Sequence, residues 1–159
     1  MNPASHPIAA APPEARLALL GWRERIGLPA LGLCSLKAKL DTGARTSSLH
    51  VDSLEAYRRD GADWLRFRVS GRRSDGAVEC TAPALDRRPV TDSGGHRSER
   101  WFIRTELLLA GHAYAIDINL TDRRAMLFPV LLGRSALLGR FAVDPALSYT
   151  HRRLARSMP

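Results

Sequence analysis

No apolar stretch of the chain approaches the roughly 20 residues that a membrane-spanning helix needs, so no membrane association is expected. The N-terminus lacks the basic start and apolar core of a secretory signal. Cysteine is scarce: Cys34 and Cys80 are the only two, too few for a disulfide framework, and each is expected to be a small buried residue. We therefore expect a cytoplasmic protein.

Lysine is nearly absent as well. Lys37 and Lys39 are the only lysines among 24 Lys+Arg, which outnumber the 16 Asp+Glu and give a formal net charge of +8. The remaining cations are arginines, whose planar fork fits carboxylates and phosphates. This balance favours an acidic partner, either a nucleic acid or an acidic peptide. A GC-rich coding sequence would produce the same bias, so charge alone does not decide the function.

A single domain with one core fits the length of 159 residues, and 45% hydrophobic with 25% charged residues is an ordinary globular composition. Proline and alanine dominate the start of the chain. We therefore divide the sequence into a flexible N-terminal segment at residues 1–20, a folded domain at 21–148 and a basic C-terminal tail at 149–159.

Short segments of alternating apolar and polar residues predict a mostly β fold. Strands are expected at residues 36–40, 65–69, 103–109, 114–120 and 129–133. A short helix is expected within residues 135–139, with Gly139 ending it. The segment from Gly71 to Ser98 has weak periodicity, which indicates an exposed hairpin or a mobile loop rather than core.

The sharpest motif is Asp41-Thr42-Gly43-Ala44, directly after the predicted strand 36–40. Its carboxylate would emerge where the chain turns, because Gly43 permits a tight bend and Thr42 can hydrogen-bond locally. A carboxylate held in this way can act as an acid or a base when a second carboxylate lies beside it. Taken alone, the motif favours a simple Asp-led turn.

Two longer segments accompany this motif. Residues 37–50 read KAKLDTGARTSSLH, and further on come LTDR at 120–123 and MLFPVLLGR at 126–134. Together they resemble a bacterial family of retropepsin-like aspartic proteases, historically labelled ATP-dependent zinc proteases, over residues 21–148. In one departure from the family pattern, Asp117 stands where a longer Glu is expected.

The resemblance implies a retropepsin-like closed β-barrel, the acid protease fold, with one short helix and one half-site per chain. It implies an aspartic endopeptidase in which a homodimer brings two copies of Asp41 together to activate water, and a flap of which residues 83–104 include part. Asp41 would be catalytic and would need no metal or other cofactor. The further site residues are Thr42, Gly43 and Ala44 in the active-site loop, and Arg45, Arg123 and Arg134 for substrate binding.

The old family label fails a direct test on the residues. No His-Glu-x-x-His zinc site is present, and the five histidines show no ligand spacing. Residues 27–32 begin and end with glycine, but Leu33 and Cys34 follow where a phosphate-binding loop needs Lys and then Ser or Thr. We predict neither zinc nor ATP as a cofactor.

Arg45 stands just past Asp-Thr-Gly-Ala, where viral retropepsins typically carry an acid that faces bound peptide. A guanidinium there favours a substrate carboxylate, so an acidic, glutamate-rich peptide or protein is expected. The resemblance adds an ATP-grasp glutamate ligase and a ribosomal protein tail as partners. Alternatively, Arg45 pairs with Asp52 or Asp122, and Arg123 and Arg134 serve backbone carbonyls near a dimer interface.

Two other functions remain open from the sequence. The first is a non-catalytic peptide-binding partner of a glutamate ligase on the same fold, which would have no reason to keep the paired acid. The second is a nucleic-acid binder, prompted by the charge, but no nucleic-acid motif is present. His50 is expected to be packed or partly exposed, and Trp22, Trp64 and Trp101 to be core or interface anchors rather than base-stacking platforms.

Overall fold

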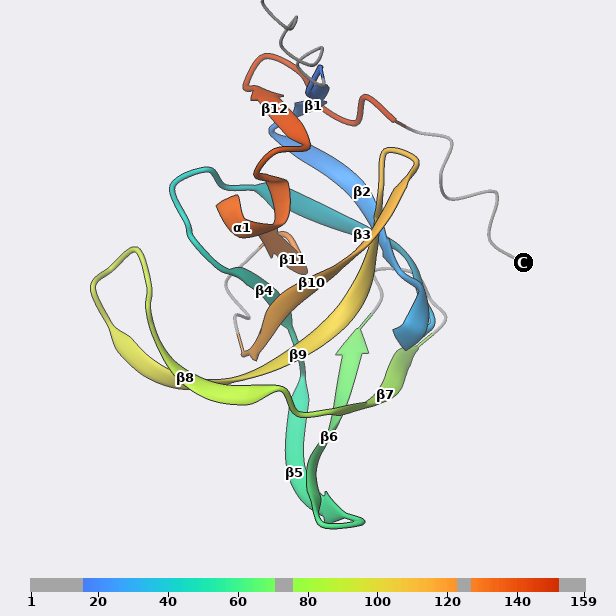
Figure 1. Ribbon diagram of the computed structural model, residues 1–159, viewed down its shortest axis with the longest axis vertical. Coiled ribbons are helices and arrows are strands. Elements are labelled where there is room, and N and C mark those ends of the chain that lie inside the picture. Colours follow the sequence, from blue (N-terminus) through green and yellow to red (C-terminus); the bar gives the residue numbers. More distant parts are fainter. Residues whose placement is uncertain (1–15, 71–75, 123–126, 152–159) are drawn as a thin grey trace, which may run out of the picture.

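The computed structural model describes residues 16–70, 76–122 and 127–151 (Figure 1). The strands in chain order are β1 (Ala18–Gly21), β2 (Arg23–Leu28), β3 (Leu33–Leu40), β4 (Ser47–His50), β5 (Ser53–Arg59), β6 (Ala62–Ser70), β7 (Ala77–Pro83), β8 (Asp86–Thr91), β9 (Arg97–Leu109), β10 (His112–Thr121), β11 (Val130–Leu132) and β12 (Phe141–Asp144). A 3₁₀ turn, η1 (Pro29–Leu31), and one short helix, α1 (Arg134–Leu137), complete the described chain. The predicted mostly β fold with one short helix is confirmed.

Six strands close into a barrel. Around the ring they run β10, β4, β11, β3, β2 and β9, and β9 pairs back with β10 through an antiparallel hairpin. The turn of that hairpin falls at Ala110 and Gly111, both with positive φ. Closure leaves the ring without a free edge. The predicted closed barrel of the acid protease fold is therefore confirmed.

Strand β11 positions the candidate site. It lies between β3 and β4, parallel to β3 and antiparallel to β4, although β3 and β4 are neighbours in the chain. The connection at residues 41–46 must therefore cross the end of β11. This crossing places the Asp-Thr-Gly motif at the end of β11, between the end of β3 and the start of β4.

The core follows the alternation predicted from the sequence. On β6 the buried residues Leu65, Phe67 and Val69 are 0%, 0% and 1% exposed, whereas the residues between them face outward. The same alternation on β3 buries Leu36 and Ala38. Burying apolar area at about 25 cal/mol per Å² is the main stabilising contribution of such faces.

The segment from Gly71 to Ser98 matches the predicted exposed hairpin only in its second half, where β8 and the start of β9 are paired and mostly exposed. Its described part contains β7, which pairs with β6 in a three-stranded sheet with β5 and buries Cys80 and Ala82. Cys80 and Ala82 lie beside Phe67 and Leu65 on the same face of this sheet and extend its buried apolar side. Burial also raises the pKa of the Cys80 thiol.

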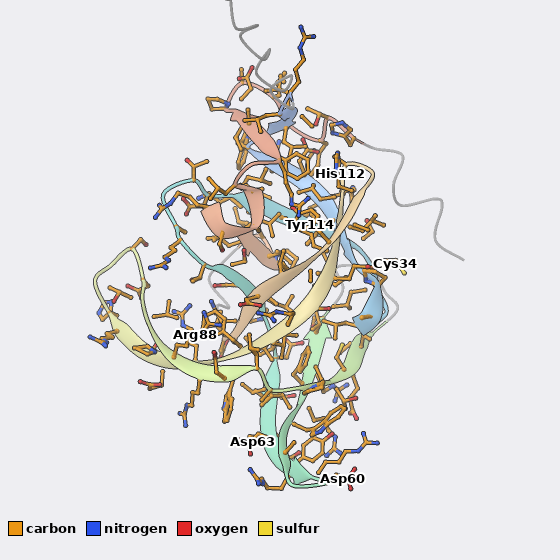
Figure 2. All side chains as sticks on the ribbon, viewed as in Figure 1. Cys34, Asp60, Asp63, Arg88, His112 and Tyr114 are labelled. Atoms are coloured by element: carbon orange, nitrogen blue, oxygen red, sulfur yellow. The ribbon has the colours of Figure 1, made fainter. Side chains whose placement is uncertain are left out.

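The prediction that both cysteines are buried is wrong for Cys34, which is exposed and lies at the edge of the molecule in Figure 2. The pairing of β2 with β3 shifts register between Ile26 and Leu28, so that β3 carries an extra residue there. Such a bulge interrupts the in–out alternation, and Cys34 and Ser35 both face outward.

The two ends of the domain meet beside β2. Strand β1 begins at Ala18 and pairs with β12, so residues 18–20 of the predicted flexible segment are in fact strand (Figure 1). At the other end, the Tyr149 amide donates to the Arg23 carbonyl (2.9 Å), and the Thr150 amide donates to buried Glu24 (3.1 Å). The beginning of the predicted tail is therefore anchored to the barrel.

Within the described ranges, no helix is both long and apolar enough to cross a membrane.

Candidate active site

Asp41 directly follows the last residue of β3. Its amide donates to the Leu132 carbonyl at the end of β11 (2.8 Å), and its own carbonyl accepts from the Ala44 amide (3.2 Å). Its Oδ1 accepts from the Gly43 amide (2.9 Å), which orients the carboxylate. Among the described residues, none donates a hydrogen bond to Oδ2. The half-buried carboxylate thus presents one oxygen that can bind water, a substrate or a shared proton.

Arg134 holds the loop through hydrogen bonds to its backbone carbonyls. Its Nη1 donates to the carbonyls of Thr42 and Gly43, both at 3.0 Å, and its amide donates to the Ala44 carbonyl at 2.7 Å. These contacts match the alternative that Arg134 serves backbone carbonyls; its role in substrate binding stays a prediction. The sequence suggested that a hydrogen bond of the Thr42 hydroxyl would hold the turn. The turn is held instead by the hydrogen bonds of the Gly43 amide and of Arg134.

Gly133 allows β11 to approach the loop closely. A Cβ at this position would lie 2.4 Å from the Thr46 carbonyl oxygen and 2.9 Å from that of Ala44. The Gly133 backbone amide donates to Ser47 Oγ (3.0 Å), and the side-chain Nδ2 of buried Asn119 donates to the Ser47 carbonyl (2.8 Å). Sequence reasoning missed Ser47 and Asn119; polar residues inside otherwise apolar strand patterns were the available signal.

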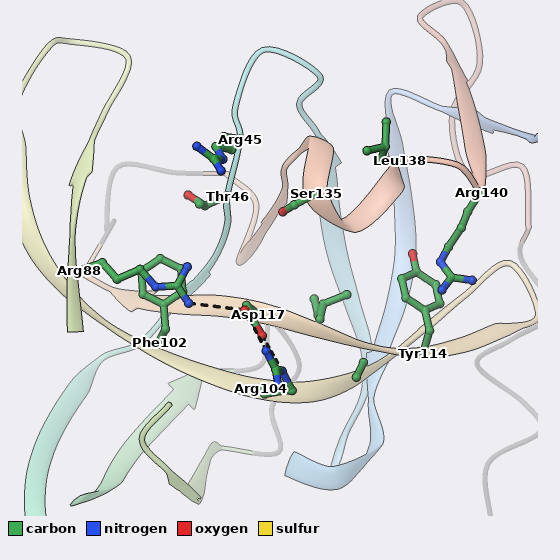
Figure 3. Close-up of a pocket in the computed structure, with 12 residues that line it drawn as sticks. Arg45, Thr46, Arg88, Phe102, Arg104, Tyr114, Asp117, Ser135, Leu138 and Arg140 are labelled. Atoms are coloured by element: carbon green, nitrogen blue, oxygen red, sulfur yellow. Dashed lines mark hydrogen bonds and ion pairs between the residues drawn. The ribbon is translucent and has the colours of Figure 1, made fainter. Parts of the chain in front are cut away.

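A cavity of about 620 Å³ opens beside this loop (Figure 3). Its lining comes from the loop, from β8, β9 and β10, and from the segment around α1. The residues are Arg45, Thr46, Arg88, Phe102, Arg104, Tyr114, Ala115, Ile116, Asp117, Ser135, Leu138 and Arg140. The lining contains four arginines and a single carboxylate, so its charge matches an anionic ligand. Of the predicted substrate-binding residues, Arg45 lines this cavity, whereas Arg123 lies outside the described residues.

Asp117 pairs with two of these arginines. Arg104 Nε donates to its Oδ1 at 2.8 Å, and Arg88 Nη2 donates to its Oδ2 at 3.5 Å. The Arg104 guanidinium, and after it Arg88, holds the pKa of the Asp117 carboxyl below its usual range. Arg88 also donates to Asp86 (2.7 Å) and stacks over the Phe102 ring. The positive charges of two of the four lining arginines are therefore balanced by carboxylates of the protein itself.

Arg140 is held differently. Its guanidinium lies over the Tyr114 ring, 4.1 Å from the centroid, and it has no ion-pair partner in the described part of the chain. The Tyr114 hydroxyl donates to the Ala136 carbonyl of α1 at 2.6 Å. Burial raises the pKa of Tyr114 to about 12, so the ring stays neutral at physiological pH.

Arg45 also has no ion-pair partner among the described residues. The sequence left open a pair with Asp52 or Asp122, but neither is formed, and Asp52 contacts Ser70 and His50 instead. Those contacts, Ser70 foremost, lower the pKa of Asp52. His50 is half-buried, in agreement with its predicted packing role.

The predicted flap segment is a hairpin of β8 and β9 that projects from the barrel (Figure 1). Asp92 closes its tip, because its Oδ1 accepts from the amides of Gly94 and His96, both at 2.9 Å. Arg88 at the base of this hairpin lines the same cavity as Arg45. The segment is suitably placed for a flap, and its closure over a substrate stays a prediction.

Within the described ranges, no group of three or more His, Cys, Asp or Glu side chains could hold a metal ion.

The closed barrel, with its Asp-Thr-Gly loop crossing the end of a central strand, defines a retropepsin-like fold. The model of the RimB-like family, described as retropepsin-like aspartic endopeptidase RimB, matches residues 19–154. The chain belongs to this family, and the resemblance found in its motifs is confirmed.

The similar proteins carry names that differ from the description of the family. Two proteins named probable alpha-L-glutamate ligase are each 39% identical: one from Desulfotalea psychrophila over 131 residues, and one from Parasynechococcus marenigrum over 136. The matches cover 81% and 84% of this chain but 28% and 29% of those proteins, so the chain spans less than a third of their length. A solved structure, Lpg0085 of unknown function (DUF785) from Legionella pneumophila, has a TM-score of 0.72 and 32% identity, covering 84% of this chain and 97% of that one.

Proposed function

We propose that this protein is an aspartic endopeptidase that hydrolyses peptide bonds in an acidic, glutamate-rich peptide or protein tail. The observation that carries the proposal is the Asp41 carboxylate, held through Oδ1 by the Gly43 amide, with Oδ2 accessible, in a chain of the RimB-like family. One chain supplies one such carboxylate, so the site requires a homodimer in which two copies of Asp41 meet.

The chemistry follows from placing two carboxyls side by side. Because like charges at short range cannot both ionise cheaply, the pair shares one proton. The ionised Asp41 takes a proton from a bound water as the water oxygen bonds to the scissile carbonyl carbon. The protonated Asp41 polarises the carbonyl oxygen. A proton then moves to the amide nitrogen as the carbon–nitrogen bond breaks, releasing an acid and an amine.

Two observations support an acidic substrate. The cavity beside the Asp41 loop has four arginines against one aspartate, and the whole chain carries a net charge of +8. The relatives named probable alpha-L-glutamate ligases contain a region like this chain joined to a longer remainder. This arrangement supports a function beside a glutamate ligase, with a glutamate-extended tail, such as that of a ribosomal protein, as the substrate.

The test is mass spectrometry of a peptide with a C-terminal run of glutamates, incubated with wild-type protein and with Asp41→Asn between mildly acidic and neutral pH. Shortened products are expected from wild type, with a loss of at least about 1,000-fold in the variant, since the attacking water loses its base. A peptide of the same length with glutamines is the substrate control. Equal cleavage by both proteins would exclude Asp41 as the catalytic group.

The ligase-like relatives also favour a second candidate, a non-catalytic peptide-binding partner of a glutamate ligase. This candidate predicts binding of the glutamate peptide by wild type and Asp41→Asn alike, and no product from either one in a dimeric preparation.

A further inference from the structure

The four arginines of the cavity fall into two electrostatic classes. Arg88 and Arg104 already share the Asp117 carboxylate, at 3.5 and 2.8 Å. Arg45 and Arg140 have no ion pair in the described part of the chain, and in Figure 3 they lie well apart, Arg140 beside Tyr114 and Arg45 above Thr46. An anion entering the cavity therefore meets two separate uncompensated cations rather than a continuous positive surface.

We propose that Arg140, positioned by Tyr114, is a carboxylate-binding residue that determines specificity, and that it acts with Arg45 to bind two carboxylates of one acidic peptide. The inference rests on the proposed function for the identity of the substrate, but it concerns binding rather than hydrolysis. Neither Arg140 nor Tyr114 lies in the motifs that carried the family resemblance.

The geometry around Arg140 suits a carboxylate. Stacking on the Tyr114 ring at 4.1 Å occupies the face of the guanidinium and leaves its edge N–H groups free to donate in pairs. The Tyr114 ring is fixed in turn, because its hydroxyl donates to the Ala136 carbonyl at 2.6 Å. Less rotamer freedom is then lost when a ligand binds, which favours affinity.

The mixed lining of the cavity suits an acidic peptide. An extended peptide places every second side chain on the same face, about 7 Å apart, so its carboxylates can reach separate cations. Apolar lining from Phe102, Ile116 and Leu138 can accept the methylene groups between them.

The proposal is tested with the hydrolytic step removed. In an Asp41→Asn background, binding of a fluorescent pentaglutamate peptide is measured by anisotropy at fixed salt, with pentaglutamine as the second ligand. Adding Arg140→Gln should weaken pentaglutamate binding at least about tenfold, the usual effect of losing a charge-assisted hydrogen-bonded pair. Binding of pentaglutamine should be unchanged, so the ratio of the two affinities falls.

The matched control is Arg25→Gln, on β2 and outside the predicted flap. Arg25 also lies over an aromatic ring, that of Tyr149 at 5.7 Å, and has no ion pair among the described residues, but it does not line the cavity. Removing it costs the same charge and should change pentaglutamate binding less than about twofold. Equal losses in the two variants would overturn the proposal, since they would show a general effect of charge.

Two further variants separate positioning from charge. Arg140→Lys keeps the charge but lacks the paired donors, and it should restore only part of the affinity. Tyr114→Phe keeps the stacking surface but releases the ring from α1, and it should weaken pentaglutamate binding about threefold without affecting pentaglutamine. If Arg140→Gln and Arg140→Lys both bind pentaglutamate as the parent does, the assignment is wrong.

The outcomes also distinguish the inference from the proposed function. Cleavage that requires Asp41, together with Arg140-independent binding, retains the function and overturns the inference. Absence of cleavage by a dimeric wild-type protein, together with Arg140-dependent binding of pentaglutamate, overturns the function and retains the inference.

Discussion

Asp117 sets how much of the cavity's positive charge is available to a ligand. Its carboxylate accepts from Arg104 and Arg88, and the pKa lowered by Arg104 first and Arg88 second keeps it ionised over the physiological range. Its side chain is 32% exposed, so each ion pair is screened by solvent and contributes below about 1 kcal/mol to folding. The larger consequence is electrostatic, because two arginines are withdrawn from ligand binding.

Replacement of Asp117 by Asn is therefore expected to have opposite effects on stability and binding. A group whose pKa is depressed in the folded state stabilises the fold above its unfolded pKa, about 4, and loses that contribution as pH falls through the lower folded value. At neutral pH, Asp117→Asn should therefore unfold at a lower urea concentration than wild type. In strong acid, the two proteins should unfold at the same urea concentration. Pentaglutamate binding should tighten roughly two- to fivefold because Arg88 and Arg104 are released. Weaker pentaglutamate binding by Asp117→Asn would show instead that Asp117 makes a favourable contact with the ligand.

At the residue scale, the sequence revealed what lies within a continuous motif. Asp41, Gly43 and Arg45 were identified because strand, turn and loop follow one another in the chain. Arg140 and Tyr114 were not, since they meet only through the pairing of β10 with its neighbours and the position of α1. Contacts between residues distant in sequence leave no local periodicity to detect.

The strands show the same division between local pattern and tertiary context. Strands β3, β6, β9, β10 and β11 were predicted because their alternation or apolar runs persist over several residues. Strand β7 was missed because its sequence mixes charged and small residues, and only the apolar face of β6 gives it a place. The outward position of Cys34 depends on a register shift between β2 and β3, which a single-strand pattern does not encode.

The contact between β11 and the Asp41 loop gives an element-scale prediction. In Gly133→Ala the new Cβ would lie 2.4 Å from the Thr46 carbonyl oxygen, so the loop must move. We expect a loss of about 1–3 kcal/mol in the free energy of unfolding, and a fall in peptidase activity on the order of 100-fold from the displaced Asp41. Urea denaturation and initial cleavage rates measure the two effects.

Gly61→Ala is the matched control for that experiment. Gly61 has φ of +78° in the distant β5–β6 turn, and no atom lies within 4 Å of a Cβ placed there. Alanine should cost about 1 kcal/mol through backbone strain alone and leave the cleavage rate unchanged. Comparable losses of activity in both variants would attribute the Gly133 effect to general destabilisation.

At the scale of the whole molecule, two electrostatic effects oppose each other. The proposed active site needs two chains, each with a formal net charge of +8, and these repel during association. The same charge attracts a glutamate-rich substrate to the arginine-lined cavity. Salt screens both interactions, since the Debye length falls from about 30 Å at 0.01 M to about 10 Å at 0.1 M.

This opposition predicts a maximum in the salt dependence of the cleavage rate when protein is dilute enough for dimers to be partly dissociated. At low salt the rate should rise with ionic strength as repulsion between protomers is screened, and at higher salt it should fall as substrate attraction weakens. Sedimentation velocity under the same conditions measures the dimer fraction, and specific activity should rise with protein concentration on the low-salt side. A substrate cleaved at a site flanked by glutamines should show the rise without the subsequent fall. Specific activity that stays constant while the protein sediments as a monomer would place the complete catalytic site within one chain, and the requirement for a second Asp41 would be wrong.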